Sequence, residues 1–80
     1  MRNECFEMIF KVRETCQNGK ERRIKKSVYS PCFKHENGRT IFVPLNERIR
    51  KGVEVLEEMN YYDIVYLETK RKTLLFTEWE

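Results

Sequence analysis

The chain has 80 residues, of which 40% are hydrophobic and 36% charged, and its formal net charge is +3. This length suits one small domain, residues 1–80, and the composition is too apolar for a wholly disordered chain. Because no run of about 20 apolar residues occurs, a membrane-spanning helix is excluded.

Residues 4–16 fit two kinds of structure. Apolar residues at positions 6, 8, 10 and 12 alternate with charged ones, which is typical of a half-buried strand. Apolar residues at positions 5, 9, 12 and 16 also recur at helical spacing. We favour the strand, because Asn18-Gly19 is a strong hairpin signal and a second extended run follows. The acids in this segment argue against a signal peptide, so we expect a cytoplasmic protein.

The middle of the chain continues the extended pattern. Residues 21–30 read as a strand, and Pro31 predicts a bend or an edge at its end. A second Asn-Gly pair, Asn37-Gly38, predicts another hairpin, whose second strand covers residues 40–43.

A helix is expected at about residues 46–60, with Asn46 as its cap and apolar residues at helical spacing. Residues 61–68 and 73–79 then predict a C-terminal β-hairpin around the polar stretch TKRKT. The predicted fold class is therefore α+β, a small antiparallel sheet with one principal helix.

The charges are unevenly distributed along the chain. Residues 20–51 carry ten cations against three acids, whereas residues 52–80 carry three cations against seven acids. The densest stretch is KERRIKK at residues 20–26, and on a strand its cations would alternate between the two faces. A cationic row at a spacing of about 7 Å resembles the phosphate repeat of a nucleic acid. The residues predicted to contact phosphates are Lys20, Arg22, Arg23, Lys25, Lys26, Arg48 and Lys51, with Tyr29 and Phe33 stacking on bases.

Metal and catalytic chemistry receive less support. Cys5, Cys16, Cys32 and His35 include the types of residue that form a zinc site, but zinc ligands usually come as two tight pairs. We interpret the cysteines as reduced and mostly buried, and expect no metal or cofactor. On one strand Cys32 and His35 would point to opposite faces, so we expect no enzyme activity.

Residues 30–56, SPCFKHENGRTIFVPLNERIRKGVEVL, resemble part of the RNA-binding toxins of the HicA type. The shared features are FKH, the NGR turn, a strand ending in VPL, and KG before an apolar-periodic helix. The resemblance implies a double-stranded-RNA-binding-like fold and RNA binding. That family carries its catalytic histidine in a Gly-Ser-His step, where this chain has Ser30-Pro31-Cys32. The resemblance therefore does not extend to nuclease activity, and the first helix of that family conflicts with a strand at residues 4–16.

The predicted function is non-catalytic binding of RNA or single-stranded nucleic acid. The alternative is a protein-binding inhibitor, of phage type or antitoxin-like, that occupies a nucleic-acid enzyme such as a ribonuclease. A chain this short buries a limited fraction of its surface, so a homodimer is considered beside the monomer.

Overall fold

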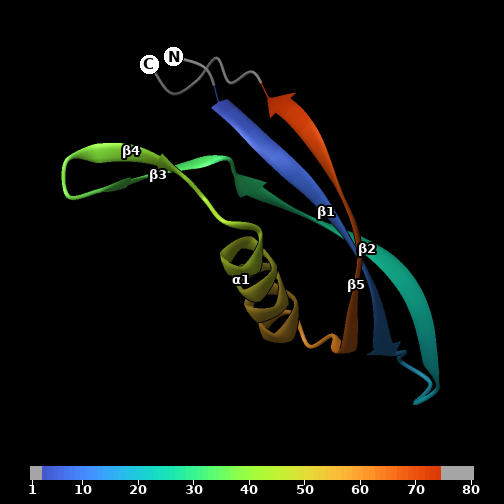
Figure 1. The fold of residues 1–80 in the computed structure, drawn as a ribbon. Coiled ribbons are helices and arrows are strands. Elements are labelled where there is room, and N and C mark those ends of the chain that lie inside the picture. Colours follow the sequence, from blue (N-terminus) through green and yellow to red (C-terminus); the bar gives the residue numbers. More distant parts are fainter. Residues whose placement is uncertain (1–2, 75–80) are drawn as a thin grey trace.

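A computed structural model describes residues 3–74 of the chain (Figure 1). The elements in order are β1 (Asn3–Thr15), β2 (Glu21–Pro31), β3 (Phe33–Glu36), β4 (Arg39–Phe42), α1 (Leu45–Glu58) and β5 (Tyr62–Leu74). One antiparallel sheet has the order β2-β1-β5, and β3 and β4 form a separate hairpin. The predicted α+β class is confirmed. No helix in this part of the chain is long and apolar enough to cross a membrane.

The first segment is a strand, as favoured from its alternation. It pairs with β2 without interruption from Cys5↔Pro31 to Thr15↔Glu21. Gly19, with φ 84°, adopts the left-handed conformation that the predicted Asn-Gly turn requires. The β1–β2 hairpin is therefore determined by local turn chemistry together with the period-two pattern.

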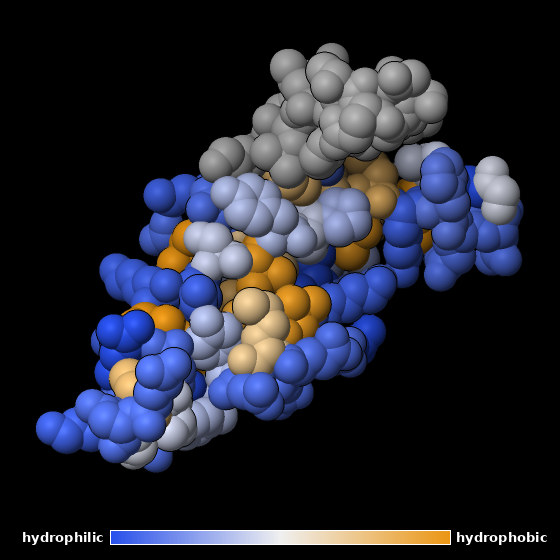
Figure 2. Space-filling model, turned by 180° about the vertical axis from the view of Figure 1, so that it is seen from behind, coloured by the Kyte–Doolittle hydropathy of each residue, from blue (hydrophilic) through white to orange (hydrophobic). Residues whose placement is uncertain are grey.

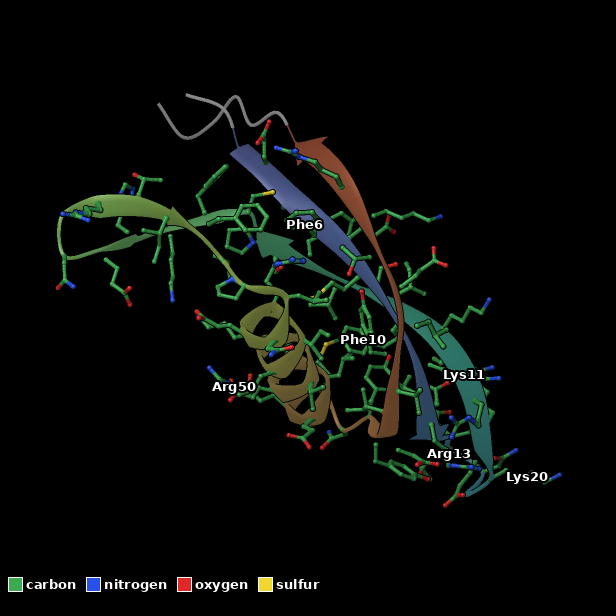
Figure 3. All side chains as sticks on the ribbon, in the orientation of Figure 1. Phe6, Phe10, Lys11, Arg13, Lys20 and Arg50 are labelled. Atoms are coloured by element: carbon green, nitrogen blue, oxygen red, sulfur yellow. The ribbon has the colours of Figure 1, made fainter. Side chains whose placement is uncertain are left out.

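Helix α1 covers one face of the three-stranded sheet. The fully buried side chains Met8, Phe10, Val12 and Leu56 form the core, to which β1 contributes alternate residues. In Figure 3 Phe10 points toward α1, whereas Lys11 lies on the far side of the sheet. We call this far side, which α1 does not cover, the open face.

Gly52 brings α1 close to the sheet. A Cβ atom at this position would lie 2.9 Å from Cζ of Phe10 and 3.1 Å from Cε of Met8. Both side chains are fully buried, so neither has free space into which to move. The glycine that weakens the isolated helix is thus required by the packing.

The helix boundaries differ from the prediction. The helix begins at Leu45 after Pro44, which occupies the cap position without a side-chain hydrogen bond, and Asn46 lies inside the first turn. It ends at Glu58, and Asn60, with φ 70°, reverses the chain. Pro44 has no backbone N–H with which to continue the sheet after β4, and its fixed φ suits the start of a helix.

The predicted C-terminal hairpin is wrong within the described residues. Strand β5 runs through TKRKT without a turn and pairs with β1 along its length, from Arg13↔Tyr62 to Asn3↔Leu74. This stretch contains no glycine, asparagine or proline to support a turn, and β1 satisfies its backbone hydrogen bonds. Residues 75–80 of the expected second strand lie outside the described residues.

The β3–β4 hairpin, which we call the arm, projects from the body of the molecule (Figure 1). Asn37 and Gly38, with φ of 54° and 76°, form the predicted tight turn. At its base, Nζ of Lys34 lies 2.8 and 2.9 Å from the two carboxylate oxygens of Glu47 in α1. This ion pair lowers the pKa of Glu47 and raises that of Lys34.

The molecule is elongated, with principal dimensions of 47 × 28 × 20 Å. A band of apolar residues runs through the middle of the face shown in Figure 2, bordered by hydrophilic side chains. One helix and three strands therefore leave part of the apolar surface uncovered.

Substituting Gly52→Ala is expected to destabilise the protein by about 1 kcal/mol. Overpacking against Phe10 and Met8 costs about 1–3 kcal/mol, which exceeds the gain of about 1 kcal/mol in helix propensity. Urea unfolding measures the change, with exposed Glu54→Ala on the same helix as the control. An increase in stability for Gly52→Ala would contradict the tight packing.

The Lys34–Glu47 pair predicts a loss of stability in acid. Because the folded pKa of Glu47 lies below its ordinary value of 4.5, the contribution is complete above that value and is lost as the pH falls through the folded pKa. Urea midpoints should therefore fall more for the wild type than for Glu47→Gln between about pH 5 and about pH 3. Glu54→Gln, on the exposed side of α1, should retain the wild-type pH dependence.

Candidate nucleic-acid interface

The cations of KERRIKK do not share one surface. Arg23 and Lys25 lie on the open face, whereas Arg22 and Lys26 lie on the side of α1, as the predicted alternation requires. Lys20 lies in the turn before β2, at the far end of the hairpin (Figure 3).

The two cations on the helix side have partners within the fold. Nε of Arg22 donates to Oε2 of Glu14 at 2.5 Å, and this contact raises the pKa of Arg22. Nζ of Lys26 lies 5.2 Å from the centre of the Tyr61 ring. Arg22 therefore connects β2 to β1, and Lys26 connects β2 to the segment after α1. Both contribute less to an open cationic surface than cations without a partner would.

On the open face, β1 supplies two further cations that the sequence prediction missed. Lys11 lies directly opposite Lys25, and Arg13 lies directly opposite Arg23. We call these four residues the basic quartet. Counting outward from the Asn18-Gly19 turn would have paired them, because the hairpin is regular from the turn onward.

The two pairs of the basic quartet differ electrostatically. Oδ2 of Asp63, from β5, lies 2.7 Å from Nη1 of Arg23 and 3.3 Å from Nη2 of Arg13. By contrast, Lys11 and Lys25 are exposed and have no ion pair with any described residue. Like charges directly opposite in a sheet are destabilising, so this lysine pair favours an external anion.

The two predicted stacking residues lie on different surfaces. Tyr29 is 43% exposed and follows Lys25 on the open face of β2. Phe33 belongs to the arm and packs edge-to-face on Phe42, with the ring centres 5.7 Å apart. Of the two, only Tyr29 lies on the same face as the basic quartet; Val65 of β5, 46% exposed and opposite Lys11, adds apolar surface beside the quartet.

Arg48, one of the residues predicted to contact phosphate, is buried in the fold. Arg48 is only 5% exposed, its Nε donates to the carbonyl of Val43, and its guanidinium stacks 3.9 Å above the ring of Phe6. It joins α1 to the base of the arm. Lys51 is exposed on α1, where it lies 3.8 Å from Glu47 and away from the basic quartet.

Groups that would support catalysis or metal binding are dispersed. None of the three cysteines forms a disulfide, and burial raises the pKa of the Cys32 thiol. His35 is exposed on the arm, 3.2 Å from Oγ1 of Thr40. Among residues 3–74 no three His, Cys, Asp or Glu side chains are grouped so as to hold a metal ion.

Comparisons with protein-family models, with curated proteins and with solved structures found no match. The basic quartet and the surface around it are therefore the features from which a function can be inferred.

Replacing Lys25 by glutamate is expected to stabilise the fold. An opposite-charge pair across β1 and β2 contributes about 0.2–1 kcal/mol, whereas the present lysine pair is repulsive. Thermal unfolding at low salt should show the gain, and added salt should reduce it. Lys20→Glu in the turn makes the same charge change without a directly opposed lysine. A lower melting temperature for Lys25→Glu would contradict the repulsion.

Proposed function

We propose that the protein binds RNA or single-stranded nucleic acid through the open face of its sheet, without catalysis. The observation that carries this proposal is the Lys11–Lys25 pair, two exposed cations held directly opposite each other without a counter-ion among the described residues. A sheet holds such a pair at a cost in stability, and an anionic ligand offsets that cost.

The spacing of the basic quartet suits a phosphate backbone. Residues two apart on one strand, such as Lys11 and Arg13, are separated by about 7 Å, and opposed residues by about 5 Å. Successive phosphates along one strand of a nucleic acid can therefore each meet a cation. No deep cavity is needed, because the contact is made along an exposed face.

The surface beside the basic quartet suits bases that are not paired. Tyr29 lies four residues along β2 from Lys25, about 13 Å away, and Val65 lies opposite Lys11 on β5. A base stacks on an aromatic ring without regard to sequence, provided that its face is accessible. Accessible bases occur in single strands, loops and bulges, which favours these over a continuous duplex.

A protein-binding inhibitor is the second candidate, and the outer surface of α1 favours it. Glu54, Glu57 and Glu58 are exposed there beside Val55 and Met59, which are 43% and 55% exposed. An acidic surface with apolar side chains complements a basic cleft in an enzyme that binds nucleic acid. This surface lies on the helix and is separate from the open face.

Fluorescence anisotropy with a labelled single-stranded RNA, from about 50 to about 200 mM salt, tests the proposal. The wild type should bind with a steep loss of affinity as salt rises. Lys11→Gln combined with Lys25→Gln should weaken binding and reduce the slope of log K against log salt by about 1.4. Arg50→Gln with Lys51→Gln on α1 removes the same charge from another surface and should retain the slope.

Two results would overturn the proposal. One is the absence of binding at the lowest salt, which would favour the protein-binding inhibitor. The other is an equal loss of slope in the two double variants, which would show that net charge rather than the open face determines binding.

A further inference from the structure

Asp63 occupies an unusual backbone position. Its φ of 56° lies in the left-handed region, at the point where the pairing of β5 with β1 shifts between Lys11↔Val65 and Arg13↔Tyr62. The shift places an extra residue in β5, as in a β-bulge, which redirects a side chain. Aspartate and asparagine adopt this conformation more readily than most residues.

The bulge directs the carboxylate of Asp63 onto the basic quartet. A single oxygen, Oδ2, accepts from Nε and Nη2 of Arg13, both at 3.3 Å, and from Nη1 of Arg23 at 2.7 Å. Among the described residues, the only other acid that forms an ion pair with either arginine is Glu21. Its Oε1 lies 3.8 Å from Nη1 of Arg13. Asp63 is therefore the principal counter-ion of both arginines.

We propose that Asp63 is an internal competitor for the phosphate that the basic quartet binds, so that it sets the affinity of the site. This inference rests on the proposed function. In the free protein the single Asp63 carboxylate is shared by Arg13 and Arg23, while Lys11 and Lys25 are left for the first contact with a ligand. A phosphate then displaces the carboxylate from the guanidiniums.

A phosphate can replace the carboxylate because both groups accept hydrogen bonds from the planar guanidinium of arginine. The Asp63 side chain is 53% exposed, and an ion pair at such a position contributes little to stability. Side chains of Arg13 and Arg23, 34% and 29% exposed, remain accessible from the open face. Because the carboxylate competes for the arginines, a weakly charged anion would bind poorly. A polyanion that also contacts Lys11 and Lys25 would bind.

Asp63→Asn tests this role with little change in shape. Asparagine retains the side-chain volume and tolerates positive φ, while the charge is removed. The variant should bind single-stranded RNA about ten-fold more tightly at about 50 mM salt, because a phosphate no longer has to displace a carboxylate from the two guanidiniums. Glu68→Gln removes one acid from the same sheet near Lys70, 3.4 Å away, and should leave the affinity almost unchanged.

Thermal unfolding of each variant is measured in parallel. Should Asp63→Asn fold poorly, Asp63→Gly replaces it, because glycine accommodates the same φ and also lacks the carboxylate. Adding Arg13→Gln and Arg23→Gln to the Asp63 variant should abolish the gain in affinity.

The outcomes separate the two proposals. Tighter binding by Asp63→Asn, but not by Glu68→Gln, supports internal competition. Wild-type binding with equal or weaker binding by folded Asp63→Asn overturns the competitor role and leaves nucleic-acid binding intact. Absence of binding by both proteins at about 50 mM salt overturns the proposed function and this inference with it.

Discussion

The packing of one helix on one face of a thin sheet is the constraint on which the rest of this structure depends. Gly52 allows α1 to approach Phe10 and Met8 closely, and the alternate side chains of β1 form most of the core. A single helix covers a single face, so the other side chains of the same strands remain in contact with solvent. The small core and the open face therefore have one origin.

The register of the β1–β2 hairpin then determines what the open face carries. The Asn18-Gly19 turn pairs Lys11 with Lys25 and Arg13 with Arg23, and a shift of one residue would exchange the faces. Burial of Phe10 and Val12 opposes such a shift, because it would expose the core. The hydrophobic pattern on one side thus maintains the arrangement of charge on the other.

The basic quartet lowers the stability of the fold through charge repulsion, and the fold compensates for this loss only in part. Asp63 pairs with both arginines from a position some 40 to 50 residues away in the chain, while the lysine pair has no such partner among the described residues. Functional sites commonly contain local features that lower the stability of the fold, while packing elsewhere in the protein compensates for them. By contrast, Arg48 is a cation that the fold uses for packing, between Phe6 and the base of the arm.

The sequence by itself determined the local features of this protein. Period-two alternation and two Asn-Gly pairs specified the hairpins, and the alternation within β2 separated Arg23 and Lys25 from Arg22 and Lys26. Only the tertiary structure decided that β5 continues through TKRKT, because pairing with β1 satisfies a backbone that lacks turn residues. It also decided the burial of Arg48 and the meeting of Asp63 with Arg13 and Arg23. These contacts join distant segments, and their energies depend on packing and pairing that no short stretch of sequence encodes.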